Sequence, residues 1–196
     1  IPNLSESVIV GRDIQLAQQT GGRVHFAHVS TAQSVALIRD AKRNGLAITA
    51  ETAPHYLLLT DADVQTYDGD FKMNPPLRSR LDQEALIEGL ADGTIDAIAT
   101  DHAPHTPDEK QQAFDQCPNG VIGLETSLGA TLTALYHTQK LNPLQIIAAM
   151  STGPARCLNL PGGTLKPGSV ADITVIQPNL KWAVDPNQFK SLSKNT

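Results

Sequence analysis

Short segments with the two-residue period of a β-strand alternate along this chain with longer segments that have the period of an α-helix. The predicted strands cover residues 23–28, 46–51, 71–74 and 95–100. Alternating polarity favours a strand, whereas apolar residues at i, i+3, i+4 and i+7 favour a helix. Strands and helices that alternate at this spacing are typical of parallel βα units. We therefore expect an α/β fold built on a parallel sheet.

Capping residues and glycines indicate where the predicted helices begin and end. Val10, Ile14 and Ala17 form a helical stripe that ends at Gly21. A second helix is predicted to start after the capping-box residues 30–33 and to end near Gly45. The remaining helices are predicted by Leu86, Ile87 and Leu90 before Gly93, by Leu124, Leu128, Leu132 and Leu135, and by Asn142 and Pro143 up to Met150.

The character of the sequence changes after the Pro-Gly-Gly stretch at residues 161–163. A β-rich segment at residues 171–176 lies among Pro and Gly turns, and Trp182 and Val184 belong to a possible partner strand. We predict two units: residues 1–160 with the βα cycles, and residues 161–196 with a small β element.

The charge balance excludes several classes of partner. The chain has 15 Lys and Arg against 20 Asp and Glu, a net charge of −5, so it offers no basic surface for nucleic acid or anionic lipid. Its apolar runs are too short to cross a bilayer and no leader opens the chain, so we predict a cytoplasmic protein. Cys117 and Cys157 form no paired motif for a disulfide framework, zinc or redox chemistry.

Histidine and aspartate side chains follow the predicted strands. His28 ends the first strand, His55 follows the second and Asp101 follows the fourth. Because polar groups at the carboxyl ends of barrel strands share one face, they can form a site. Neutral imidazoles bind divalent metals, and a carboxylate beside a metal can accept and deliver a proton. For each residue alone a structural role stays open, His28 as a cap or core residue and Asp101 as a turn or N-cap residue.

Five sequence blocks strengthen the functional interpretation. They are residues 28–31 (HVST), 51–57 (ETAPHYL), 72–78 (KMNPPLR), 100–105 (TDHAPH) and 123–126 (GLET). In order and spacing they resemble the blocks of the dihydroorotase family of the bacterial type, over essentially the whole chain. That family belongs to the metal-dependent amidohydrolases, whose fold is a (β/α)8 TIM barrel.

The resemblance implies a fold and a set of metal ligands. A full barrel needs about 250 residues, so four βα cycles would be the C-terminal half of a barrel, followed by part of the superfamily's small β-domain. His28 and His55 would bind the more buried of two zinc ions. Asp101 would bind the more exposed zinc and act as general base and acid, and His102 would at most orient it.

The resemblance also implies a substrate and partners. The family catalyses the reversible hydrolysis of (S)-dihydroorotate to N-carbamoyl-L-aspartate in pyrimidine biosynthesis. Asn74 and His105 would bind the carboxylate side of this small molecule, and Gly120 in the loop 117–120 would offer backbone groups to its ring. A homo-oligomer is expected, together with possible association with aspartate transcarbamoylase.

Part of the family's pattern is missing. The chain has no His-x-His pair for the more exposed metal, and the bridging ligand and the substrate-binding Arg that accompany that pair are missing as well. It also begins at Ile1 rather than at Met. We therefore expect a piece of a longer enzyme that is incomplete and inactive by itself.

Two alternative functions stay open. A dihydropyrimidinase, hydantoinase or allantoinase would share the fold and the metals, but its substrate would lack the carboxylate that His105 binds. A non-catalytic scaffold subunit of aspartate transcarbamoylase would explain the missing His-x-His pair. Such a scaffold would have no electrostatic reason to keep His28, His55 and Asp101.

Several other polar residues receive structural interpretations. His25 and His137 are interpreted as structural, and Lys72, Arg78 and Arg80 as solvated charges. Tyr56 and Glu125 lie at positions of the resembling blocks, where each fits a supporting role as well as a packing role.

Overall fold

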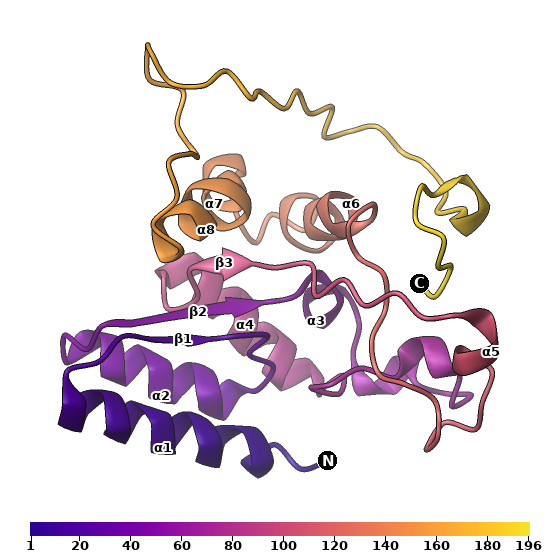
Figure 1. Ribbon diagram of the computed structural model, residues 1–196, viewed down its shortest axis with the longest axis horizontal. Coiled ribbons are helices and arrows are strands. Elements are labelled where there is room, and N and C mark those ends of the chain that lie inside the picture. Colours follow the sequence, from indigo (N-terminus) through magenta and orange to yellow (C-terminus); the bar gives the residue numbers. More distant parts are fainter.

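The computed structural model describes all 196 residues, and its centre is a small parallel sheet (Figure 1). The sheet contains β1 (Val24–Phe26), β2 (Ile48–Thr52) and β3 (Ala97–Ile98) in that order. Val24 pairs with Ile48, and Glu51 pairs with Ala97, both in parallel register. The predicted α/β fold with parallel strands is confirmed. The strands are shorter than predicted, so that His28 and Asp101 lie in the loops that follow them.

Long helices pack together against this sheet. α1 (Leu4–Thr20) packs on α2 (Ala32–Arg43), which in turn packs on α4 (Arg80–Asp92). In Figure 1 α1 and α2 lie below the strands. The first and third of these helices end where the sequence indicates, at Gly21 and Gly93. No helix combines the length and the apolar character that a membrane crossing requires.

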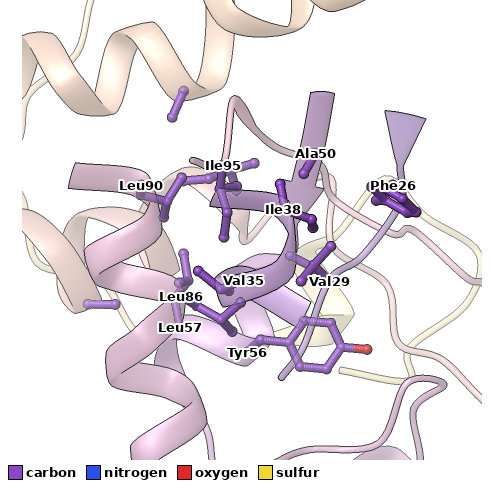
Figure 2. Packing of buried hydrophobic residues seen from close by; sticks show 14 of the residues in the cluster. Phe26, Val29, Val35, Ile38, Ala50, Tyr56, Leu57, Leu86, Leu90 and Ile95 are labelled. Atoms are coloured by element: carbon purple, nitrogen blue, oxygen red, sulfur yellow. The ribbon is translucent and has the colours of Figure 1, made fainter. Parts of the chain in front are cut away.

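Every second side chain of β2 is buried and contributes to the core between the sheet and the helices. In β2 the side chains of Ile48, Ala50 and Thr52 are buried, whereas Thr49 and Glu51 on the opposite face are only partly buried. The buried residues pack together as one cluster, shown in Figure 2, which includes Phe26, Val35, Ile38, Leu57, Leu86, Leu90 and Ile95. Apolar burial of this kind contributes about 25 cal/mol for each Å² removed from water, so this cluster fixes how the loops after β1 and β2 are placed.

Short helical segments fill the chain after β2. They are α3 (Pro54–Leu58), η1 (Asp61–Asp63), η2 (Gly69–Phe71) and α5 (Pro107–Lys110). The strand predicted at residues 71–74 is wrong, because Phe71 belongs to η2 and the residues after it form an irregular loop. Pro75 and Pro76 follow directly, and neither has the N–H group that a strand ladder needs.

The last helices contain π-helical turns. α6 (Ser127–Thr131) continues into η3 (Leu132–Tyr136), and α7 (Pro143–Ile147) continues through η4 (Ala148–Thr152) into α8 (Gly153–Cys157). The helix predicted from the leucine stripe starts later than expected. Leu124 lies before α6 and is exposed. Asn142 caps α7 by accepting the N–H of Gln145, so the predicted start at Asn142 and Pro143 is confirmed.

Residues 161–185, named the arm here, run along the top of Figure 1 without regular structure. The strands predicted at residues 171–176 and around Trp182 are wrong, since the only element after residue 160 is η5 (Pro186–Gln188). Extended backbone becomes a strand only when another strand satisfies its N–H and C=O groups, and the arm has no such neighbour. The division at residue 160 stays a prediction.

Candidate metal and substrate site

The loops after β1 and β3 each place one candidate residue in an unusual backbone conformation. His28 has φ of 41° and Asp101 has φ of 49°, both in the left-handed region. For a residue with a side chain this conformation costs about 1–3 kcal/mol, and it persists only where the surroundings impose it. Both residues therefore occupy positions that the fold holds against their local preference.

His55 lies in the first turn of α3, where Pro54 starts the helix directly after β2. Its imidazole is buried, and burial together with the nearby His28 lowers the pKa of His55 to about 4. The His55 ring is therefore neutral at pH 7, the form in which an imidazole nitrogen binds a metal.

One ring nitrogen of each histidine in this pair is buried and has no partner. His28 Nδ1 and His55 Nε2 are both buried and neither makes a hydrogen bond. Buried polar atoms are nearly always paired, and an unpaired one costs about 1–3 kcal/mol. Two buried imidazole nitrogens without hydrogen-bond partners, on histidines that interact electrostatically, fit two ligands of a zinc ion.

Asp101 is near this pair but does not complete a ligand set. No three His, Cys, Asp or Glu side chains group closely enough to hold a metal. Asp101 instead acts on Tyr56, whose pKa is raised by burial first and then by the charges of Asp101 and Glu6. The structure therefore couples His28 to His55 and Asp101 to Tyr56, and it does not group the three predicted ligands closely.

Tyr56 connects the core to the loop of Asn74. Its ring is buried in the hydrophobic cluster, and Figure 2 shows its hydroxyl pointing away from the labelled neighbours. That hydroxyl donates to the carbonyl of Pro75, the residue after Asn74, whose own side chain is exposed. Tyr56 thus contributes packing and also holds the loop that carries a predicted substrate ligand.

His105 and the loop 117–120 lie in contact. The His105 ring donates from Nε2 to the carbonyl of Asn119 at 2.9 Å, and its main-chain N–H reaches Ser193 and Asn195. Two of the predicted substrate groups, His105 and Gly120, therefore belong to one hydrogen-bonded region. Asn74 is not linked to it by a direct side-chain hydrogen bond.

Gly120 has φ of 110°, and a Cβ atom there would lie 2.4 Å from Cβ of Ala103, so only glycine fits. Its polar backbone groups are already used within the chain. The N–H donates to the carbonyl of Lys72 at 2.7 Å, and the carbonyl accepts from Lys110 and Asn195. The N–H and C=O groups of Gly120 are therefore not free to hydrogen-bond a ligand.

Two lysines hold this loop in place. Lys72 donates to the carbonyls of Asp115 and Cys117, and Lys110 donates to those of Pro118 and Gly120. Burial lowers the pKa of Lys110, because the charged ammonium loses contact with water. The interpretation of Lys72 as a solvated charge is wrong, since its ammonium group is bound to the loop.

Arg78 also differs from its expected solvated state. It is only 7 % exposed, and its guanidinium donates to Ser30, Ile1 and Asn3. Arg80, in contrast, is exposed and pairs with Glu84 on the surface of α4, so its interpretation as a solvated charge is confirmed.

His102 is hydrogen-bonded to the backbone of the turn that begins at Gly123. Its Nδ1 atom accepts the N–H groups of Gly123 at 3.0 Å and Leu124 at 3.3 Å, so the ring proton belongs on Nε2. In the same region Glu125 accepts the N–H groups of Lys190 and Ser191. Glu125 therefore supports the packing of the chain end, while the orientation of Asp101 by His102 stays a prediction.

The remaining histidines fit structural roles. Across β1 and β2, His25 hydrogen-bonds Thr49 at 2.8 Å and Glu51 at 3.1 Å, which uses both ring nitrogens. His137 is exposed beyond η3.

A cavity of about 1110 Å³ is lined by His55 and Thr100 together with arm residues such as Trp182. Asp101 and His105 are not among its lining residues.

Parallel βα units with imidazoles beyond the carboxyl ends of the strands are typical of α/β-barrel enzymes. The amidohydrolase family model matches residues 4–195, and the chain belongs to this family. The TIM-barrel fold of its structural neighbours is thereby the fold of which this chain forms a part.

Several known proteins are similar over most or all of the chain. Dihydroorotases from Pelotomaculum thermopropionicum and Geobacillus sp. are 56 % and 51 % identical over all of this chain and 46 % of their own length. The chain thus spans about half the length of these relatives. The L-hydantoinase (dihydropyrimidinase) from Arthrobacter aurescens has a TM-score of 0.82 at 31 % identity, over 87 % of this chain and 39 % of its own. A D-hydantoinase from Thermus sp. has a TM-score of 0.80 at 27 % identity, with the same coverage.

Proposed function

We propose that the protein carrying this chain is a zinc-dependent dihydroorotase, which interconverts (S)-dihydroorotate and N-carbamoyl-L-aspartate in pyrimidine biosynthesis. The observation that carries the proposal is the pair of buried, unpaired nitrogens on His28 and His55, at the ends of neighbouring strands. The similarity to named dihydroorotases over the whole chain supports the choice of reaction.

His28 and His55 would hold one zinc ion through these nitrogens. Bound zinc supplies a Lewis acid and acidifies water at neutral pH. The metal environment that the family resemblance implies also needs a His-x-His pair and a bridging ligand, which these residues do not contain. The absence of a three-residue ligand group is consistent with that requirement.

Asp101 would move the proton. In the hydrolytic direction, water forms a C–O bond to the ring carbonyl carbon while the C–N bond of the cyclic amide breaks. Asp101 accepts the proton that the water loses and delivers it to the leaving nitrogen. Asp101 follows β3 in the left-handed backbone region, as His28 does after β1.

Asn74 and His105 would bind the carboxylate of the substrate, with Gly120 packed against the ring. His105 is already placed beside the loop 117–120 by its bond to Asn119. Lys72 and Lys110 support the same loop, so one region would recognise both the carboxylate and the ring. We place the enzyme in the cytoplasm as a homo-oligomer that is able to associate with aspartate transcarbamoylase.

A hydantoinase or dihydropyrimidinase activity is the second candidate, because structural neighbours with these names have TM-scores of 0.80 to 0.82. The deciding experiment compares dihydroorotate with dihydrouracil and hydantoin as substrates of the full-length protein loaded with zinc. Turnover of dihydroorotate alone supports the proposal. Preference for either substrate without a carboxylate would reject it, and no turnover of any would favour the scaffold alternative.

A further inference from the structure

A carboxylate from the first helix reaches the loop between β1 and α2. Glu6 Oε1 accepts the N–H groups of Ser30 at 3.2 Å and Thr31 at 3.1 Å, and it lies 2.9 Å from the Thr31 hydroxyl. Glu6 Oε2 accepts the hydroxyl of Ser30. One side chain thus binds two consecutive residues through both their main chain and their side chains.

Arg78 closes this arrangement from the opposite side. Its Nε donates to the Ser30 hydroxyl at 3.1 Å, and its Nη2 lies 3.9 Å from Glu6 Oε2. The side chains of Arg78 and Glu6 are 6 % and 13 % exposed, so the pair is largely shielded from water. Ser30 therefore lies between an acceptor and a donor that are both fixed by other elements of the fold.

The held residues come directly after His28. Val29 donates its N–H to the carbonyl of Glu51, and its own carbonyl accepts the hydroxyl of Thr52. β2 therefore fixes Val29, and Glu6 fixes Ser30 and Thr31. Nδ1 of His28, whose φ is 41°, makes no hydrogen bond that would hold the ring there. The hydrogen bonds that hold this loop are made by the residues that follow His28.

We propose that Glu6 is a positioning residue, which holds the loop 29–31 so that Nδ1 of His28 stays directed at the metal shared with His55. The proposal rests on the proposed function only in assigning a metal to this histidine pair. Outer contacts that orient a ligand typically change metal affinity by about 10–100-fold when they are removed. Glu6 would act in this way although it lies 22 residues before His28 in the sequence.

A second carboxylate provides a matched control. Asp82 also binds the start of α2, by accepting the N–H of Ala32 at 2.9 Å, and it also bonds Asn3 and Ser79. Asp82 is buried and the Glu6 side chain is 13 % exposed, but the contact of Asp82 lies beyond the held loop and its other bonds cap α4. A purely structural effect would appear in variants of both residues, whereas an effect on His28 would appear only for Glu6.

The experiment measures zinc affinity by chelator competition and the melting temperature by scanning calorimetry, in the full-length protein that carries this chain. Glu6→Gln keeps the size of the side chain but turns an NH2 group toward N–H donors. We expect Glu6→Gln to bind zinc at least about 10-fold more weakly and to regain activity when zinc is added in excess. Asp82→Asn should melt at a lower temperature and keep the zinc affinity of the wild type.

Each other outcome is decisive. Wild-type zinc affinity in a folded Glu6→Gln protein would overturn the proposal, as would a wild-type protein that binds no zinc. If Glu6→Gln does not fold, Ser30→Ala removes only the hydroxyl between Glu6 and Arg78, and an unchanged zinc affinity there would overturn it equally. A protein that binds zinc but does not hydrolyse dihydroorotate would reject the proposed function, while the comparison of zinc affinities would still decide the role of Glu6.

Discussion

Asp101 and His28 share one backbone conformation, with φ of 49° and 41°, although they follow different strands of the sheet. The left-handed region is unfavourable for a residue with a Cβ atom, and it costs about 1–2 kcal/mol. Two such residues beyond the carboxyl ends of the strands indicate that the fold keeps an unfavourable backbone conformation there, and this conformation sets the direction of the two side chains. The backbone strain at position 101 can therefore be tested separately from the proposed chemical role of the Asp101 carboxylate.

Replacement of Asp101 should therefore show a reversed preference between glycine and alanine. We expect Asp101→Gly to be more stable than Asp101→Ala by about 1 kcal/mol, because glycine relieves the positive φ. Urea unfolding of the full-length variants measures this difference. At the exposed helical position Glu88 in α4 the order should be opposite, with Gly about 1 kcal/mol less stable than Ala. The same order at both positions would contradict the strain argument.

Asp101 should also be required for turnover. We expect Asp101→Asn to lower kcat for dihydroorotate by at least about 100-fold, because an amide cannot accept and deliver the proton. Steady-state assays of the zinc-loaded full-length protein provide the measurement, with exposed Asp108→Asn as control. Wild-type kcat in Asp101→Asn would remove Asp101 from the mechanism.

Gly120 should not tolerate a side chain. A methyl group there meets Cβ of Ala103 at 2.4 Å in addition to the positive φ, so we expect Gly120→Ala to destabilise by about 2–3 kcal/mol. Gly45 also has positive φ but open space around it, so Gly45→Ala should cost about 1 kcal/mol. Equal losses in thermal or urea unfolding would show that Ala103 moves away without cost.

Acid should weaken the fold through Asp82. Burial opposes ionisation of this carboxyl, but hydrogen bonds from Ser79, the N–H of Ala32 and Asn3 outweigh it and lower the pKa of Asp82 below its ordinary value. A lowered pKa stabilises the folded state above the unfolded pKa of about 3.9, and this contribution is lost as the pH falls through the folded pKa.

The measurement is the free energy of unfolding as a function of pH for the wild type and Asp82→Asn. Below about pH 4 the difference between them should shrink, because the wild-type carboxyl becomes protonated. Glu84→Gln, which changes an exposed surface pair, serves as the control. A difference that stays constant from pH 7 to pH 2 would show that the charge of Asp82 does not stabilise the fold.

Local sequence information was sufficient for the parts of the fold that depend on local chemistry. The period of apolar residues predicted α1, α2 and α4, and Asn142 starts its helix as expected, whereas α2 is capped by Thr31, one residue after the start of the predicted capping box. The strand positions were predicted from alternation, but their ends were not, because pairing partners decide where a ladder stops. His28, His55 and Asp101 were predicted as site residues from their positions after the strands and from the sequence blocks, and these assignments stay predictions.

Contacts between distant residues could not be predicted in this way. Glu6 lies 24 residues before Ser30, and Arg78 lies 48 residues after it. Nothing near Arg78 in the sequence indicates that its charge is buried, since an arginine after a Pro-Pro turn is equally typical of a surface. The predicted strands of the arm failed for the related reason that β-propensity does not supply a partner strand.

The arm is bounded by firm attachments at both ends. Before it lies α8, and after it the N–H groups of Lys190 and Ser191 bind Glu125 while Asn195 binds Ala103 and Gly120. Lys166 and Lys181 lie exposed within the arm. Pro167 protects the bond after Lys166 from trypsin, so tryptic nicking after Lys181 would leave two pieces that migrate together under native conditions and separate only in denaturant, in the manner of a noncovalent fragment complex.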